Sequence, residues 1–246
     1  METMFVGQLL FSLNEVDSTN DFLLNKLKSE SLAEGTIVVA KQQTKGKGQR
    51  GKSWLSDSNE SLLLSLLLFP KCSIQKQFFL NKAIAVSICQ ALSTFGVNAK
   101  IKWPNDIYVE NKKVSGVLIE NAIHSNQLKH SVVGVGINVN QLSFPQNLPN
   151  PTSMRLCLNK QVDRTLLLEV VCSFMEKNYL LFKNNSFTQI DDQYHSLLYK
   201  HFEYTSFKIE NKLVDLKVLG VSASGLLELE GKEGLKAFSM GEITFV

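Results

Sequence analysis

The sequence predicts an α+β fold, in which a β-sheet with flanking helices is followed by a small all-β unit. Helix-like and strand-like stretches alternate as far as about residue 200. From residue 204 the pattern changes to short strand-like segments separated by Asn211, Gly225 and Gly241. This last stretch is too short to enclose a large core, so we expect a small β-barrel docked on the main unit. The predicted domains are residues 1–202 and 203–246.

Helices are predicted from apolar periodicity and from capping residues. Ser18 or Thr19 can cap a helix through DFLLNKLKSE that ends by Gly35. Asp163 can cap a second helix that runs through TLLLEVVCSFMEKNYLLF. The other two predicted helices cover residues 76–95, where apolar side chains recur at every fourth position, and about 187–200.

Strands are predicted from apolar and β-branched runs. Residues 61–69 form a continuous apolar run of strand length, so we expect this strand in the middle of the sheet with both faces covered. Residues 141–153 contain three prolines and are predicted to be a loop. The other predicted strands are 36–42, 98–103, IYVEN and KVSGVLIENAI joined as a hairpin at Asn111-Lys112, and SVVGVGINVN.

Composition excludes several classes of protein. The hydrophobic fraction is 44%, which predicts a solid core rather than disorder, and the net charge of +3 is too small to indicate a polyanionic partner. The four cysteines are far apart and form no C-x-x-C pair, so they are interpreted as reduced. The first residues lack the basic segment of a signal peptide, and the longest apolar run is far shorter than the roughly 20 residues that span a bilayer. We therefore expect a cytoplasmic protein with no membrane partner.

A loop rich in glycine and lysine lies between Lys41 and Lys52 and contains no acidic residue. Its glycines let the backbone approach a ligand, and its cations can balance phosphate charge. It is not a Walker A loop, because no G-K-[ST] sequence closes it and no helix follows directly. A solvated, flexible basic loop is the alternative interpretation.

The segment KWPND (102–106) places a lysine near the end of a predicted strand. Pro104 favours an extended conformation at Trp103, so Lys102 is held close to the turn that contains Asn105 and Asp106. An ammonium beside a carboxamide and a carboxylate suits a site for carboxylate, phosphate and Mg²⁺. The alternative is a surface lysine beside a Pro-Asn turn.

The segment GVGINVN (134–140) places Gly134, Gly136 and Asn138 on one face of a predicted strand. Glycine inside a strand often marks close approach by a ligand or by another backbone, so these residues can form a shallow groove. A glycine that accommodates a neighbouring helix is the alternative, and Gly116 allows the same two interpretations. Lys113 is interpreted as a solvated cation at a strand end.

Ser18, Thr19 and Asn20 can be a simple helix cap, or they can offer donors and acceptors to a polar ring of a substrate. The segments EVDSTND, KQQTKGKGQRGKSW, KWPND, KVSGVLIEN, GVGINVN and GEITF occur in this order along the chain. Together they resemble the biotin–protein ligases over essentially the whole length.

The resemblance implies a mixed sheet flanked by helices, as in class II synthetase-like biotin ligase domains, with a small C-terminal SH3-like barrel. It implies formation of biotinyl-5′-AMP from biotin and ATP with Mg²⁺. Biotin then passes to a lysine of a biotin carboxyl carrier protein, or of the carrier domain of a biotin-dependent carboxylase. Mg²⁺ is expected to bind through the ATP phosphates, with Asp106 as a candidate ligand. A homodimer is an open alternative.

The resemblance also implies roles for individual residues. Lys102 is expected to lie at the biotin carboxylate and the reacting α-phosphate, and thus to be catalytic. The common G-R-G-R-R-G loop of the family reads GKGQRG here, so Lys47 loses the fork of arginine and Gln49 loses a charge. The residues expected at biotin are Ser18, Thr19, Asn20, Gln43, Lys47, Gly48, Gln49, Lys102, Gly116, Gly134 and Gly136. Those expected at ATP are Lys47, Arg50, Trp54, Asn105, Asp106, Lys113 and Asn138.

Three other functions remain to be weighed. A lipoate or octanoate ligase or transferase has a related fold but needs an apolar tunnel, which the polar residues around position 19 argue against. A nucleic-acid-binding module would use the basic loop, but the cations form no stripe and no aromatic residues are interleaved with them. A ligand-binding pseudoenzyme is the third. Only 17 residues precede Ser18, too few for the winged-helix domain of some family members, so no DNA binding is expected.

Overall fold

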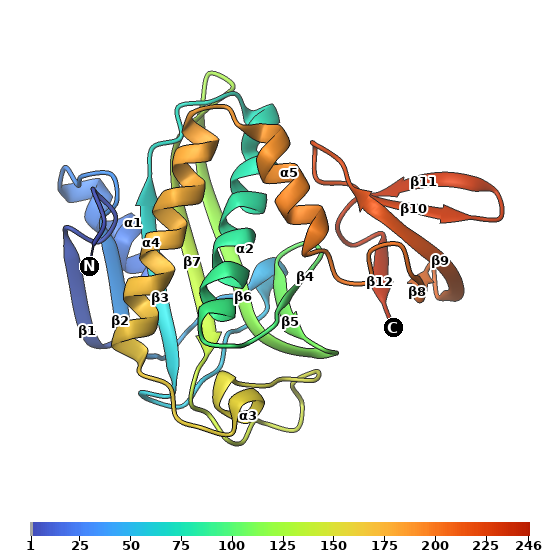
Figure 1. The fold of residues 1–246 in the computed structure, drawn as a ribbon. Helices are drawn as coiled ribbons and strands as arrows, with labels where there is room; N and C mark the ends of the chain where they lie inside the picture. Colours follow the sequence, from blue (N-terminus) through green and yellow to red (C-terminus); the bar gives the residue numbers. More distant parts are fainter. Residues whose placement is uncertain (1) are drawn as a thin grey trace.

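The computed structural model describes residues 2–246 (Figure 1). Its larger sheet has seven strands in the order β1-β2-β3-β7-β6-β5-β4. β1 and β2 are parallel, whereas the other neighbouring strands are antiparallel, so the predicted mixed sheet is confirmed. The strands are β1 (Leu10–Val16), β2 (Ile37–Gln43), β3 (Ser61–Leu68), β4 (Lys100–Lys102), β5 (Asp106–Val109), β6 (Lys112–His124) and β7 (Gln127–Asn138).

Strand β3 occupies the interior of this sheet, as its sequence predicted. All of its side chains are buried. Leu66 belongs to the large core on one face, while Leu67 belongs to a smaller core with Leu23 on the other face. Because neighbouring side chains point to opposite faces, a strand covered on both sides is expected to be mostly apolar, and six of the eight residues of β3 are leucines.

Three helices, α2 (Gln77–Thr94), α4 (Arg164–Lys183) and α5 (Phe187–Ser196), cover one face of the sheet, and α1 (Thr19–Ser29) lies on the other (Figure 1). The predicted caps are confirmed: Ser18 Oγ accepts a hydrogen bond from Asp21 N, and the Asp163 carboxylate accepts from the first turn of α4. The helices α1 and α5 end earlier than predicted. A short helix, α3 (Met154–Leu158), was not predicted.

Two details of the strand prediction need correction. β1 was not predicted, although it forms an edge of the sheet and pairs in parallel with β2. The hairpin between β5 and β6 is confirmed, but its turn consists of Glu110 and Asn111, one residue before the predicted position.

The C-terminal segment forms a second, antiparallel sheet in the order β11-β10-β9-β8-β12. Among residues 2–246 the two end strands do not pair, so the expectation of a closed barrel was wrong. The reason is visible in Figure 1, where β10 and β11 extend away from β12 as a hairpin. The strands are β8 (Tyr204–Ile209), β9 (Lys212–Val221), β10 (Leu227–Gly231), β11 (Gly234–Phe238) and β12 (Ile243–Phe245).

The second sheet is attached to the helical layer through a buried lysine. Lys82 of α2 is fully buried, pairs with Asp191 of α5 at 2.5 Å, and donates to the carbonyl of Val221 in β9 at 2.6 Å. Val221 N in turn donates to His195 Nε2 of α5 at 2.9 Å. One apolar core extends across both sheets, so the predicted boundary between residues 202 and 203 stays a prediction.

Candidate functional site

A cavity of about 450 Å³ lies over the sheet, on the face that carries α1. Its floor comes from strands β3, β7 and β6, where Gly116 lies opposite Gly136 and Gly134 lies opposite Ser65. Its walls come from the glycine- and lysine-rich loop and from residues 240–245 of the C-terminal segment. A volume of this size is typical of small-molecule sites.

Every residue that the sequence analysis assigned to a ligand lines this one cavity. The roles assigned to these residues stay predictions, because the structure contains no ligand. The lining residues in question are Ser18, Thr19, Asn20, Gln43, Lys47, Gly48, Gln49, Arg50, Trp54, Lys102, Asn105, Asp106, Lys113, Gly116, Gly134, Gly136 and Asn138.

One end of the cavity, called the polar end here, is a hydrogen-bonded cluster of Thr19, Asn20, Gln43, Ser65 and Glu120. Gln43 Oε1 accepts from Thr19 N at 2.7 Å and from Thr19 Oγ1 at 3.0 Å. Asn20 Oδ1 accepts from the Ser65 hydroxyl at 2.6 Å, and Asn20 Nδ2 donates to Glu120 at 2.6 Å. These bonds fix which atoms of each amide group face the cavity.

The strand glycines allow two side chains to lie directly on the sheet. A Cβ atom at Gly134 would lie 2.5 Å from Asn20 Oδ1, and one at Gly136 would lie 2.5 Å from Cε2 of Trp54. The Trp54 ring also approaches Gly116. The expected groove therefore exists, and Asn20 and Trp54 fill it in this structure. The indole Nε1 of Trp54 is buried and has no hydrogen-bond partner among residues 2–246.

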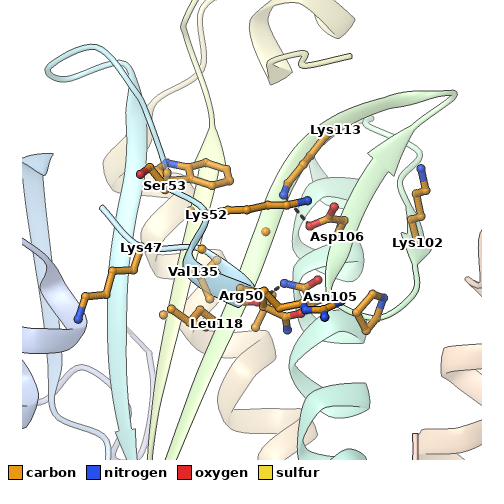
Figure 2. A pocket seen from close by; sticks show the side chains of 18 of the residues that line it. Lys47, Arg50, Lys52, Ser53, Lys102, Asn105, Asp106, Lys113, Leu118 and Val135 are labelled. Atoms are coloured by element: carbon orange, nitrogen blue, oxygen red, sulfur yellow. Dashed lines mark hydrogen bonds and ion pairs between the residues drawn. The ribbon is translucent and has the colours of Figure 1, made fainter. Parts of the chain in front are cut away.

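The other end, called the cationic end here, contains Arg50, Lys52, Lys102 and Lys113 with Asp106. Lys113 forms an ion pair with Asp106 at 2.6 Å, and Lys52 reaches toward this pair from the loop (Figure 2). Lys102 is half-buried and has no carboxylate within ion-pair distance in the described part of the chain. Burial lowers the pKa of Lys102, while the nearby Asp106 carboxylate opposes this shift.

The basic loop is folded back on itself rather than extended. Gly48 N donates to Lys52 O at 2.7 Å, Trp54 N donates to Gly46 O at 2.9 Å, and Arg50 has a left-handed backbone with φ 55°. The Arg50 guanidinium lies against Gly241, where an added Cβ would overlap it. The loop tip is therefore in contact with the C-terminal segment.

Lys47 does not join the other cations. Its ammonium forms an ion pair with Asp21 of α1 at 2.6 Å, and this hydrogen bond raises the pKa of Lys47. Figure 2 shows Lys47 at one side of the view and Lys102 at the opposite side. Asn105 and Asn138 are buried, and their amide groups donate to the carbonyls of Val117 and Thr152 at 2.7 and 2.9 Å.

Five residues that hold the polar end or surround Lys102 were not proposed from the sequence. Ser65 and Glu120 fix the polar end, and three aromatic residues surround the Lys102 ammonium. Of the five, Glu120 lies in KVSGVLIEN and Phe245 in the closing GEITF, two segments that the sequence analysis had singled out. The aromatic residues are Tyr108, Tyr199 and Phe245.

The cavity offers few ligands to a metal ion. Within residues 2–246 no group of three or more histidine, cysteine or acidic side chains could hold one. Asp106 is the single carboxylate among the lining residues, against the five cations Lys47, Arg50, Lys52, Lys102 and Lys113. The lining charge therefore favours an anionic ligand. No helix in the described chain is long and apolar enough to cross a membrane.

Comparisons with known proteins agree on one family. Residues 13–138 match the model of the biotin/lipoate A/B protein ligase family. The chain is 31% identical to the bifunctional ligase/repressor BirA of Bacillus spizizenii, over 99% of this chain and 76% of that protein. It is 27% identical to the biotin–[acetyl-CoA-carboxylase] ligase of Mycobacterium tuberculosis, over 57% of this chain and 52% of that one.

A solved structure agrees over the full fold. The biotin protein ligase of Aquifex aeolicus, in complex with biotin and ATP, has a TM-score of 0.81 and 32% identity to this chain. The match covers 97% of this chain and 99% of that one. Both the sequence and the fold therefore show that the chain belongs to the biotin/lipoate A/B protein ligase family.

Proposed function

We propose that this protein is a biotin–protein ligase, which activates biotin with ATP and transfers it to a lysine of a carrier protein. One observation carries the proposal: a single cavity joins a hydrogen-bonded polar end to a cationic end. The polar end suits the ureido ring of biotin, and the cationic end suits its carboxylate and the phosphates of ATP. The similarity to a solved ligase bound to biotin and ATP supports the same assignment.

In the first step a carboxylate oxygen of biotin attacks the α-phosphorus of ATP, and pyrophosphate leaves. Both partners are anions, so negative charge accumulates where they meet. We assign the stabilisation of this charge to Lys102, which has no carboxylate partner among residues 2–246, together with Lys113 and the cations of the loop. Without that neutralisation, repulsion between the two reactants would dominate.

Mg²⁺ fits this site only as a partner of the nucleotide. Because Asp106 is the one lining carboxylate, the ion would be held by phosphate oxygens and water with at most this side chain. When bound, Mg²⁺ neutralises part of the phosphate charge. Asp106 is also the partner of Lys113, so the same carboxylate sets the position of one cation.

In the second step the amine of a carrier lysine attacks the carbonyl carbon of biotinyl-5′-AMP. AMP leaves, and the amine nitrogen loses a proton. The mixed anhydride reacts with water as well, so the site has to exclude water until the carrier arrives. The folded loop, whose tip contacts Gly241, is suited to cover the intermediate. The proposed partner is the biotin carboxyl carrier protein or carrier domain of a carboxylase.

Incubation with biotin, Mg-ATP and a carrier domain, read by mass spectrometry, tests the whole proposal. We expect the carrier to gain one biotinyl group on its target lysine, and a carrier with that lysine changed to arginine to gain none. Pyrophosphate release without the carrier measures the first step alone. No biotin-dependent pyrophosphate release would reject the proposal.

Lipoate or octanoate is the acyl substrate to compete against biotin, since the matched family includes lipoate ligases. Thr19 already occupies Gln43 Oε1, so Gln43 Nε2 is the amide group that faces a substrate, and a linear apolar chain would leave this donor without a partner. We therefore expect neither acid to displace biotin at equal concentration. We also propose a cytoplasmic location, which the four free cysteines support.

A further inference from the structure

The Lys102 ammonium lies among three aromatic rings, here called the aromatic box. Its Nζ is 4.5 Å from the centroid of Tyr108, 5.1 Å from that of Phe245 and 5.8 Å from that of Tyr199. Nζ also donates to Tyr108 Oη at 3.3 Å. Distances of this order allow attraction between the cation and the electron-rich ring faces.

The box is assembled from three separate parts of the chain. Tyr108 belongs to β5, Tyr199 follows α5, and Phe245 belongs to β12 of the second sheet. Tyr199 Oη donates to Asn111 Oδ1 at 2.6 Å, and the centroids of Tyr108 and Tyr199 are 5.6 Å apart. Each part brings its own support, so the rings are held independently of the lysine.

Phe245 is fixed by the second sheet. It lies opposite Phe207 in the β12–β8 ladder, and the two ring centroids are 4.6 Å apart. Phe207 is fully buried. The wall of the box that Phe245 forms therefore moves only if the second sheet moves.

The lysine in this box has an unusual environment. A half-buried ammonium normally pairs with a carboxylate, yet Asp106 pairs with Lys113 instead. The rings offset part of the cost of removing water from Lys102 without neutralising its charge. An ammonium that is ordered, partly dehydrated and still positive attracts an incoming anion more strongly than a hydrated one.

We propose that the aromatic box holds Lys102 ready for the two anionic reactants, and that Phe245 of the second sheet is a positioning residue for this lysine. The proposal rests on the function proposed above, because it assumes that Lys102 serves adenylate formation. It assigns the second sheet a part in the first chemical step. A lysine has a flexible four-carbon stem, so a residue that restricts it acts on the rate of that step.

Phe245→Leu tests the proposal, since it keeps an apolar side chain and removes the ring. We expect kcat for biotin-dependent pyrophosphate release to fall about 10-fold, with KM for biotin changed less than about twofold. Phe245→Tyr restores a ring and is expected to recover most of the loss. Phe238→Leu is the matched control, since Phe238 is a half-buried phenylalanine of the same sheet outside the cavity. It should leave kcat unchanged.

The pH profile provides a readout that a merely structural role would not change. Lys102 has to be protonated, and burial lowers its pKa, so activity should decline at a lower pH than for an exposed lysine. Asp106, Lys113, Tyr108 and Tyr199 are the titratable groups that face it. Loss of the Phe245 ring removes one attraction for the ammonium, which alone would lower the pKa of Lys102, and lets water return, which raises it. Because burial is the main cause of the lowered pKa, the return of water should dominate and the pKa should rise. The alkaline limb of kcat should therefore move to higher pH in Phe245→Leu and stay in place in Phe238→Leu.

Nuclear magnetic resonance of the ligand-free protein measures the contact between Lys102 and the aromatic rings independently of the reaction. Ring currents should shift the Lys102 ε-methylene protons upfield, and Phe245→Leu should reduce this shift. If the shift is reduced while kcat and the alkaline limb stay unchanged, the positioning role is overturned and the proposed function survives. If the unaltered protein shows no biotin-dependent pyrophosphate release, the proposed function itself fails, whereas retained release in Lys102→Ala refutes only the role assigned to Lys102. Should Phe245→Leu fold poorly, Tyr199→Leu opens the box from the segment that follows α5 and carries the same expectations.

Discussion

The two ends of the cavity differ in how their polar groups are bonded within the protein. At the polar end, Thr19, Asn20 and Gln43 are tied to one another and to Ser65 and Glu120 by bonds of 2.6 to 3.0 Å. At the cationic end, Lys102 has no carboxylate partner in the described chain, and its neighbours are rings and a hydroxyl group. One end is held by internal hydrogen bonds without a ligand, and the other is short of negative charge.

The difference indicates how binding and chemistry are divided. Neutral donors and acceptors discriminate best when they cannot rotate, because a wrong substrate then leaves them unpaired. Cations stabilise a reaction best when their charge is not already neutralised by the protein. Substitutions at the polar end should therefore change affinity for biotin, and substitutions at the cationic end should change the rate of adenylate formation.

The largest expected effect comes from removing the unpaired cation. Lys102→Ala should lower kcat for pyrophosphate release by about 1000-fold or more, because nothing else replaces the charge at that position. The melting temperature should stay close to that of the wild type. Lys100→Ala is the matched control, since Lys100 is exposed and lies on the same strand. Near-normal pyrophosphate release by Lys102→Ala would refute the assigned role.

Substitutions of two strand glycines compare the rigidity of the polar end with that of the basic loop. Gly134→Ala would press against Asn20, which three bonded groups hold in place, whereas Gly136→Ala would press against Trp54 of the loop. We expect Gly134→Ala to cost about 1–3 kcal/mol of unfolding free energy, and Gly136→Ala to cost less because the loop can shift. Urea unfolding measures both. Equal losses would contradict the difference in rigidity.

The sequence could predict the site residues far better than it could predict what holds them. A strand, a proline and a turn that follow one another locally singled out Lys102, and the resemblance to the biotin–protein ligases assigned its role. Ser65 gave no signal, since its importance arises only when β3 lies beneath α1. Tyr199 and Phe245 lie close to Lys102 although each is more than 90 residues away in the sequence, and no local sequence pattern predicts such a contact.

The fold shows the same division between local and long-range information. The continuous apolar run of β3 and the caps at Ser18 and Asp163 are local signals, and all three predictions are confirmed. β1 was missed because it is an edge strand with many exposed side chains, so its apolar pattern is weak. Whether the second sheet closes into a barrel depends on pairing between its two end strands, which a sequence of short strands does not specify.

Ser65→Ala should have an intermediate effect at the polar end. It removes the donor to Asn20 Oδ1 and leaves Asn20 held only through Nδ2, so its position is less well fixed, and KM for biotin should rise about 10-fold with kcat nearly unchanged. Ser61→Ala is the matched control on the same strand, because the buried Ser61 hydroxyl has no hydrogen-bond partner among residues 2–246. A fall in kcat without a change in KM would contradict the assignment of biotin affinity to the polar end and of reaction rate to the cationic end.

The smallest effect is expected at the exposed ion pair between Lys47 of the basic loop and Asp21 of α1. Asp21→Asn releases Lys47 from α1, and because both side chains are partly exposed the pair should contribute less than about 1 kcal/mol to stability. KM for biotin should therefore change less than about twofold. Asp17→Asn is the matched control, since it releases Lys45 from a similar exposed pair outside the cavity. A large rise in KM for Asp21→Asn, with none for Asp17→Asn, would mean that the ion pair holds the loop in its binding position. Lys47 would then act in the binding of biotin, like the residues of the polar end, rather than in charge stabilisation.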